Sequence, residues 1–571
     1  MSNERLTGYP SIDKPWLKYY ESPETFVVPM CKNYDYIYSR AKRNGSRIAL
    51  RYLNAAISYD KMFQKVDEAT KALKQMRVKE GDIVSVCLPN IPEVVYIYYA
   101  INRVGAIANM LDLRCNASEL LRSCEDAESE LLIALDMVLD KFKEYSEKTF
   151  IKHIVSVNPL NSIGGIPAFA SVLKSKNSKN IITWNTFIKN GKNYADTIDS
   201  KYCPNTAAVI AYTGGTTGVP KGVTVSNESL NAILEMNRYN QFPVEVGDRS
   251  LLIAPPWTYY GLNNCINGYL SMGQEIIMLP KVGADELGQL IMKYKPNHII
   301  TVPSALHAVV RDVPLEYDLS FLKSLIVGAD KLDETFEEEF NSFLDKHHAP
   351  AVLAKGYGMT EVTAAAAYTL PNCNLTGSVG IPYVGNVISV FDTESTTPIE
   401  KKIGERGEIA ITGPTVMQGY FGSAAFETNS ILIRHADGKL WAHTGDIGHL
   451  NANGVLYIDG RIKRMFVKNG YKIFAGEVEN QIMKNPIVLN CAVVSIPDSV
   501  KGCKEIAFCV LKENEKKAFA EEKIEEMLRN NLYDYEIPDQ YIFIKELPLT
   551  GMNKTDYRAL ENLAWKENGN E

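Results

Sequence analysis

Glycine, threonine and lysine residues concentrate in one short stretch of this sequence, and together they suit the binding of a phosphate chain. Residues 213–222 read TGGTTGVPKG and follow the apolar run Ala207–Ala211, so the stretch is expected to be a loop that leaves a strand. Glycines let successive backbone N–H groups face one point, and threonine hydroxyls and a lysine add donors and positive charge. The order Lys-Gly, with no Ser or Thr after the lysine, distinguishes the stretch from a Walker A loop. The residues expected to contact phosphates are Thr213, Gly214, Gly215, Thr216, Thr217, Gly218 and Lys221.

Three further motifs follow this loop along the chain. Residues 357–361 read YGMTE, residues 441–446 read WAHTGD, and residues 547–556 read LPLTGMNKTD. Arg461 stands fifteen residues after Asp446. Each string alone is a weak signal, but their order behind a glycine- and threonine-rich loop makes the combination specific.

In this order the motifs resemble the signature of the adenylate-forming superfamily, which includes acyl- and aryl-CoA synthetases, peptide adenylation domains and beetle luciferases. The resemblance is strongest to the acyl-CoA synthetases and covers roughly residues 57–560. It implies an enzyme that activates a carboxylic acid with ATP and Mg²⁺ as acyl-AMP, releases pyrophosphate, and passes the acyl group to the thiol of coenzyme A.

The resemblance also implies roles for single residues. The Tyr357 ring would lie against adenine, Glu361 would hold Mg²⁺, and Asp446 would accept hydrogen bonds from both ribose hydroxyls. Lys554 matches the catalytic lysine, although Asn553 stands where the family usually has glycine. We expect Lys554, Thr216 and Glu361 to act in catalysis. The other residues expected to bind the nucleotide or to form the hinge near it are Gly328, Ala329, Gly358, Met359, Thr360, Arg461, Lys463 (the hinge) and Gly470.

The acid is expected to bind near four segments, residues 257–264, 302–304, 328–330 and 356–363. Residues 255–261 contain no aspartate to pair with an α-amino group, which argues against an amino acid substrate. A fatty acid is the first expectation, and an aryl or other hydrophobic acid is the second. The residues expected to line this pocket are Trp257, Thr258, Tyr260, Gly261, Asn264, Ser304, Asp330, Gly356 and Thr363.

Strand-like and helix-like segments alternate up to about residue 381, which predicts an α/β fold with largely parallel sheets. Short strands bounded by Gly and Pro then indicate a β-rich subdomain. We expect a large domain of stacked mixed sheets with packed helices at residues 1–460, and a small mobile α+β domain carrying the catalytic lysine at residues 461–571.

The bulk composition narrows the function classes. Lys and Arg total 61 against 68 Asp and Glu, so the net charge of -7 argues against a nucleic-acid binder. The ten cysteines form no Cys-x-x-Cys pair, which argues against zinc. Neither a signal peptide nor a run of about 20 apolar residues is visible, so we expect a cytoplasmic protein without a transmembrane segment.

Two alternatives to the CoA ligase remain open at this stage. One is a stand-alone enzyme that loads the acyl group onto the phosphopantetheine of a separate carrier protein. The other is a non-catalytic nucleotide- or acyl-binding homologue, against which the joint presence of Lys554, Glu361 and Asp446 argues.

Overall fold

A computed structural model of the chain describes most of its residues. The described residues are 6–142, 150–163, 181–213, 220–281, 283–395, 397–469, 471–498, 501–512, 515, 517–549 and 555–569. None of the helices in these ranges has the length and apolar character needed to cross a bilayer.

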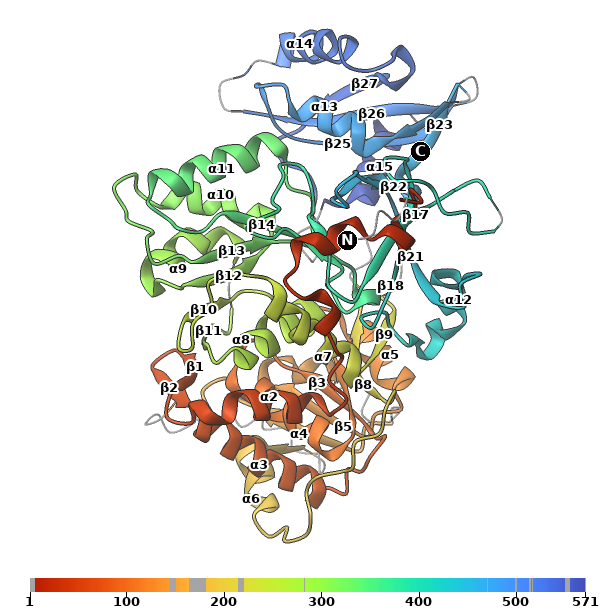
Figure 1. Cartoon of the computed structure of the whole chain (residues 1–571). Coiled ribbons are helices and arrows are strands. Elements are labelled where there is room, and N and C mark those ends of the chain that lie inside the picture. Colours follow the sequence, from red (N-terminus) through yellow and green to blue (C-terminus); the bar gives the residue numbers. More distant parts are fainter. Residues whose placement is uncertain are drawn as a thin grey trace.

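An eight-stranded sheet lies in the lower part of the molecule (Figure 1). Its central strands are parallel, because each is joined to the next by a crossover that includes a helix, as the predicted alternation requires. At one edge β8 (Ala207–Tyr212) turns back into the antiparallel β9 (Gly222–Ser226), so the predicted phosphate loop joins two paired strands. The remaining strands are β3 (Ile83–Cys87), β4 (Ile107–Met110), β5 (Leu131–Leu135), β6 (His153–Val157), β7 (Ile181–Thr183) and β19 (Gly419–Phe421).

A nine-stranded sheet stands next to the first, and its parallel centre carries most of the candidate site. In this centre β10 (Arg249–Leu252), β12 (His298–Thr301), β13 (Ser324–Val327) and β14 (Leu353–Tyr357) are adjacent. Helices α9 (Leu287–Tyr294), α10 (Pro303–Asp312) and α11 (Glu334–Lys346) cover its outer face with a separate apolar core. The other strands are β1 (Ile48–Tyr52), β2 (Ala55–Ser58), β11 (Glu275–Met278), β15 (Ala367–Tyr368) and β16 (Ile381–Pro382).

Between the two sheets lies the main hydrophobic core. Every residue of α4 (Pro92–Val104) is buried there, which is expected for a helix that contacts a layer on each side. Two of its polar side chains belong to a buried network: Asn102 donates to Asn227, and the Tyr98 hydroxyl donates to Asn33. Nearby helices are α2 (Asn33–Ala41), α3 (Tyr59–Gln75), α7 (Asn227–Met236), a π-helix (Tyr260–Asn267) and α8 (Gly268–Ser271).

The β-rich part predicted beyond residue 381 is an antiparallel sheet. Its strands are β17 (Val387–Phe391), β18 (Gly407–Thr412), β20 (Leu432–Arg434), β21 (Leu440–Leu450) and β22 (Leu456–Arg461). The strand expected at residues 454–458 begins two residues later, at Leu456, because Gly454 adopts a left-handed turn with φ of 78° before β22.

Beyond β22 the chain folds around two small cores of its own, at one end of the molecule (Figure 1). A three-stranded sheet is flanked there by helices, which is the α+β character predicted for the C-terminal part. The division at residues 460/461 and the mobility of this part stay proposals. The elements are β23 (Met465–Lys468), β24 (Tyr471–Phe474), α13 (Ala475–Met483), β25 (Val488–Asp498), β26 (Gly502–Leu511), α14 (Lys517–Arg529), β27 (Gln540–Phe543) and α15 (Tyr557–Glu567).

Candidate functional site

A cavity of about 1680 Å³ opens at the carboxyl ends of the parallel strands in the nine-stranded sheet. Ligands of open α/β sheets bind at this edge. The volume exceeds the range of roughly 300–1,000 Å³ that holds a single small ligand, so the cavity has room for more than one. The C-terminal part contributes to its lining through Tyr557, Arg558 and Glu561.

Three residues from distant segments form a hydrogen-bonded group on one side of the cavity. The Tyr357 hydroxyl donates to Asp446 Oδ2 at 2.7 Å, and Arg461 Nε lies 2.7 Å from Asp446 Oδ1. Strands β21 and β22 place Asp446 directly opposite Arg461. Burial and the neighbouring Asp446 raise the pKa of Tyr357 well above its ordinary value, so the hydroxyl remains a donor. Each Asp446 oxygen keeps a lone pair for a further donor, such as a ribose hydroxyl.

Glu361 lies on a second wall of the same cavity and is only 7% exposed. The Tyr420 hydroxyl donates to its Oε1 at 2.7 Å, whereas its Oε2 has no hydrogen-bond partner among the described residues. No group of three or more His, Cys, Asp or Glu side chains in the described part of the chain is arranged to hold a metal ion. The single carboxylate therefore fits a Mg²⁺ ion that takes its other oxygens from phosphates and water.

Lys221 faces the cavity from the end of the predicted phosphate loop. It forms an ion pair with Glu427, and its Nζ lies 4.9 Å from the centre of the Tyr420 ring. The Thr213 N–H donates to Lys221 O at 2.9 Å, and Lys221 N donates to Thr213 Oγ1 at 3.1 Å. These bonds hold the two ends of the loop together at the cavity wall.

The turn after β13 and the segment after β14 form a third wall. Ala329 has φ of 70° and Ala364 has φ of 65°, left-handed conformations that non-glycine residues rarely adopt and that cluster at functional sites. At Gly358 a Cβ atom would come within 2.5 Å of Ala364 O, so only glycine allows this close approach. Gly328, Gly356, Met359 and Thr360 line the cavity beside them.

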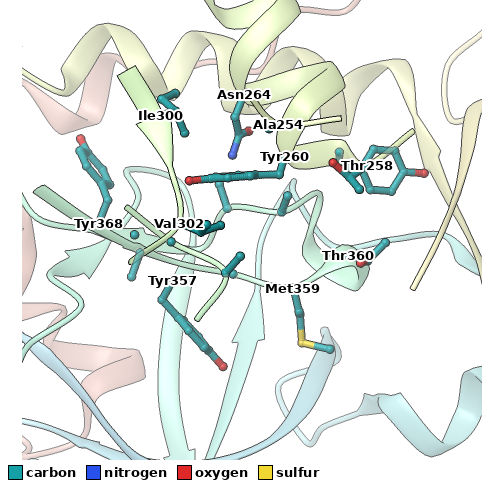
Figure 2. Close-up of a pocket in the computed structure, with 18 of the residues that line it drawn as sticks. Ala254, Thr258, Tyr260, Asn264, Ile300, Val302, Tyr357, Met359, Thr360 and Tyr368 are labelled. Carbon is teal, nitrogen blue, oxygen red and sulfur yellow. The ribbon is translucent and has the colours of Figure 1, made fainter. Parts of the chain in front are cut away.

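On the acid side, Tyr260 and Asn264 project from the π-helix into the cavity (Figure 2). The Tyr260 hydroxyl donates to Thr301 O at 2.8 Å, which holds the ring against the end of β12. The Thr258 hydroxyl is engaged locally, since it donates to Pro255 O at 3.0 Å and accepts from Gly261 N at 3.1 Å. Asn264 Oδ1 is buried and has no hydrogen-bond partner in the described part of the chain.

Five residues expected in the acid pocket do not line the cavity. Thr363 is fully buried and donates to Thr415 O, and Gly261 packs so closely that a Cβ would lie 2.0 Å from Pro255 O. Trp257 lies beneath the Arg114 guanidinium at 5.3 Å, while Ser304 and Asp330 are exposed outside the cavity. Thr363 and Gly261 therefore shape the walls from behind rather than face a ligand.

Several predicted site residues lie outside the described residues, and their roles stay predictions. They are Gly214, Gly215, Thr216, Thr217, Gly218, Gly470 and Lys554. The described residues on either side of the Lys554 motif are close together, because Leu549 and Thr555 form a β-bridge. Lys463, the expected hinge, lines the cavity in a short turn directly after Arg461.

Sequence reasoning missed residues that reach the cavity from other segments. Tyr420 arrives on β19, and Glu408 supports Gly445 by accepting its N–H at 3.0 Å. No spacing in the sequence links either residue to the motifs. Tyr557 could have been found, since it follows Lys554 by three positions, and its ring carries the Arg464 guanidinium at 3.7 Å.

The chain matches a known family over most of its length. The profile described as AMP-binding enzyme matches residues 37–421, more than half of the chain, and the profile of the AMP-binding enzyme C-terminal domain matches residues 477–554. The chain therefore belongs to the AMP-binding enzyme family, and the resemblance inferred from the motifs is confirmed.

The relatives found include both acyl- and aryl-CoA ligases. A long-chain-fatty-acid–CoA ligase from Bacillus subtilis (strain 168) is 29% identical over 560 residues, covering 96% of this chain and 97% of the relative. A 4-coumarate–CoA ligase from Vanilla planifolia is 24% identical over 541 residues, covering 92% of each. ATP, Mg²⁺ and coenzyme A, the predicted cofactors, are those of such CoA ligases.

Solved structures confirm the predicted fold class. ATP-bound MatB from Rhodopseudomonas palustris matches with a TM-score of 0.80 at 21% identity, covering 94% of this chain and 99% of that one. The anthranilate CoA ligase AuaEII in complex with anthranoyl-AMP also has a TM-score of 0.80, at 20% identity, and the match covers 96% of this chain and 100% of that one.

Proposed function

We propose that this member of the AMP-binding enzyme family is an acid–thiol ligase that joins a fatty acid to coenzyme A through an acyl-AMP intermediate. The observation that carries the proposal is that Tyr357, Arg461 and Glu361 line one cavity, with Asp446 bonded to Tyr357 and Arg461 at its wall. The same cavity extends along β12 and β13 as the acid channel, lined by Ile300, Val302 and Ile326. This arrangement offers a hydrogen-bond acceptor for a sugar hydroxyl and a carboxylate that can bind a metal ion. It also leaves space for a second ligand at the carboxyl ends of the same parallel strands.

In the first step, a carboxylate oxygen of the acid attacks the α-phosphorus of ATP, and the bond to pyrophosphate breaks. The chain must hold two anions together and stabilise charge on the α-phosphoryl group. Asp446 and Arg461 position the ribose, the loop before Lys221 receives the phosphates, and Lys554 supplies positive charge near the leaving oxygen. Mg²⁺, held by Glu361 when bound, supplies positive charge to the phosphates.

For phosphates to reach Lys221, its ion pair with Glu427 must open. Both side chains are partly exposed, at 29% and 35%, so water screens the pair and the exchange of one carboxylate for a phosphate costs little. Lys221 is thus held at the cavity wall and remains accessible to a phosphate group.

In the second step, the sulfur of coenzyme A attacks the acyl carbon, its proton is lost, and AMP leaves. We propose that the C-terminal part rotates about Lys463 between the steps, which removes Lys554 and admits the thiol. The position of Lys463 at the end of β22, between two separately packed cores, supports a hinge there.

A fatty acid is proposed because the channel has an apolar middle. Ile300, Ile326 and Val302 form its floor on the sheet, and Met272 and Phe242 also line it. The similarity to a long-chain-fatty-acid–CoA ligase over nearly the full length of both chains points the same way.

The test is pyrophosphate release by the purified chain with ATP and Mg²⁺ across a panel of carboxylic acids, with and without coenzyme A. We expect turnover with aliphatic acids that requires coenzyme A and yields the acyl-CoA. Acyl-AMP that forms but is not discharged by coenzyme A would refute the CoA acceptor and indicate a carrier-protein thiol. Turnover with aryl acids alone would refute the fatty acid.

A further inference from the structure

We propose that the far end of the acid channel is a built hydrogen-bonding site for a hydroxyl group, so that the preferred substrate is a hydroxylated acid rather than a plain alkyl acid. The site is the distal polar cluster, formed by Ser250, Gln274, His298 and Ser324. The inference rests on the acid–thiol ligase function proposed above and names the substrate class of that same channel.

The cluster lies at the opposite end of the sheet from the nucleotide side. Along β12 and the residue that follows it, His298, Ile300 and Val302 alternate onto one face, and all three line the cavity. Ser324 and Ile326 on β13, and Gly328 directly after it, do the same. Four residues of strand separate the polar and catalytic ends, which is about 13 Å. An extended chain of roughly ten atoms spans this length, since a C–C bond of about 1.5 Å advances it by somewhat less than that.

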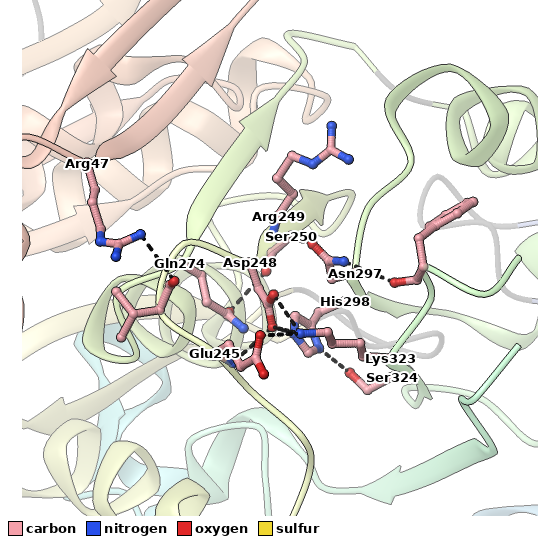
Figure 3. Close-up of polar contacts among 12 residues, drawn as sticks. Arg47, Glu245, Asp248, Arg249, Ser250, Gln274, Asn297, His298, Lys323 and Ser324 are labelled. Carbon is pink, nitrogen blue, oxygen red and sulfur yellow. Dashed lines mark hydrogen bonds and ion pairs between the residues drawn. The ribbon is translucent and has the colours of Figure 1, made fainter.

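Strand register brings the cluster into one row across the sheet. Ser250 on β10 is paired with His298 on β12, and His298 is paired with Ser324 on β13. Gln274, just before β11, reaches the same row, because its Oε1 accepts from the Ser250 hydroxyl at 3.0 Å. Figure 3 shows the contacts that connect these side chains with the charged residues behind them.

His298 converts Ser324 into an oriented acceptor. Its Nε2 lies 2.8 Å from Asp248 Oδ2 and its Nδ1 lies 2.8 Å from Ser324 Oγ. Burial lowers the pKa of His298, partly opposed by Asp248, so we assign the neutral ring with its proton on Nε2. The Ser324 hydroxyl then donates to Nδ1, and its lone pairs remain free for a donor from the channel.

Gln274 supplies the complementary donor. Its side chain is 1% exposed, yet its Nε2 has no hydrogen-bond partner among the described residues and the residue lines the cavity. Because Gln274 lines the cavity, this amide takes its partner, a water or a ligand hydroxyl, from the channel. A hydroxyl can accept from Gln274 or donate to Ser324, which a methyl end cannot do.

The surrounding charges favour a neutral group over an ion. Asp248 accepts from Lys323 at 2.9 and 3.1 Å as well as from His298, and Lys323 also pairs with Glu245 at 2.9 Å. These charges are matched to one another, so the cluster itself offers no free cation for a second carboxylate and no free carboxylate for an amine. Arg40 and Arg238 also line the cavity, and a diacid substrate tests whether either of them receives a carboxylate. Burying an unpaired charge there would be unfavourable.

The test compares decanoic acid, 10-hydroxydecanoic acid and decanedioic acid as substrates of the full chain, by pyrophosphate release with ATP, Mg²⁺ and coenzyme A. We expect kcat/KM for the hydroxy acid to exceed that for decanoic acid about tenfold or more, because the alkyl acid leaves buried polar groups unpaired. Gln274→Met and Ser324→Ala should each reduce this ratio several-fold, while Ser324→Thr, which keeps the hydroxyl, should restore it. Ile300→Val, an apolar change on the same channel floor, should leave the ratio unchanged.

A ratio at or below one in the unaltered chain would overturn the inference, as would a preference for decanedioic acid or a ratio that neither variant moves. In those cases turnover itself shows that the ligase function stands. If no acid supports pyrophosphate release, the proposed function fails instead. Calorimetric binding of the same three acids then decides whether the channel prefers the hydroxyl, and equal affinities would overturn the inference. Melting curves identify any variant that does not fold.

Discussion

The Asp446 carboxylate is the group whose replacement tests the nucleotide site most sharply. Its two oxygens accept from the Tyr357 hydroxyl and the Arg461 guanidinium at 2.7 Å each, and the side chain is only 5% exposed. Asp446→Asn preserves the shape but replaces one acceptor oxygen with a donor. We expect loss of a charge-assisted hydrogen bond to a ribose hydroxyl, worth about 1.5–3 kcal/mol. That energy corresponds to a rise of roughly ten- to 150-fold in KM for ATP.

The assay is acid-dependent exchange of pyrophosphate into ATP, measured with ATP and with 2′-deoxy-ATP. The unaltered chain should prefer ATP, and Asp446→Asn should lose most of that preference, because the group that reads the hydroxyl is gone. Tyr357→Phe removes only the contact that orients Asp446, so its effect should be smaller, about threefold to tenfold. Asp437→Asn is the matched control, since this exposed carboxylate accepts from Trp441 Nε1 and the Lys439 N–H and from no residue that lines the cavity.

The reasoning would be refuted if Asp446→Asn kept the preference for ATP over 2′-deoxy-ATP while binding both more weakly. That pattern would mean that Asp446 only braces Tyr357 and Arg461 and does not face the ribose. A loss of melting temperature shared by both Asp446→Asn and Tyr357→Phe would point to the same structural role.

Four other changes have defined outcomes. Glu361→Gln should lower kcat for pyrophosphate release by about 10²–10³ and raise the Mg²⁺ concentration needed for half activity; an unchanged Mg²⁺ titration would contradict the metal role. Lys554→Ala should lower the adenylation rate by about 10²–10³ or more, and a normal adenylation rate would remove it from catalysis. Lys463→Pro should restrict φ at the proposed hinge and slow thioester formation more than adenylation in single-turnover assays, whereas equal losses would count against a hinge. Burial raises the pKa of Glu93 to about 7. A carboxyl pKa raised on folding contributes stability that is present below about pH 4.5 and is lost as pH rises through 7. Glu93→Gln should therefore raise the melting temperature more at pH 8 than at pH 5, corresponding to up to about 3 kcal/mol in the free energy of unfolding. A difference in melting temperature that does not depend on pH would contradict this.

Local sequence order was enough to predict much of the fold. Apolar runs that alternate with helical periodicity predict parallel strands and covering helices, because each pattern can bury its apolar face in only one way. The prediction that the stretch from residue 213 leaves a strand is confirmed for the same reason, since it follows the buried run that forms β8 and carries turn residues.

The acid pocket was harder to predict, as Thr363 and Gly261 illustrate. Both belong to segments that reach the cavity, yet their side-chain positions point to other segments: Thr363 toward Thr415 and Gly261 toward Pro255. Which residue of a segment faces a ligand depends on backbone turns, such as the left-handed pair at residues 363 and 364, that residue type alone does not predict.

The sequence by itself determined the family, the order of the nucleotide motifs and the alternation of elements, because these depend on neighbours along the chain. Tertiary structure alone decided that Tyr420 supports Glu361 and that Gln274, His298 and Ser324 lie in one row and line one cavity. Those contacts arise from strand order and register, in which a shift of one residue would turn every side chain to the opposite face. The proposed preference for a hydroxylated acid therefore depends on pairings between distant strands.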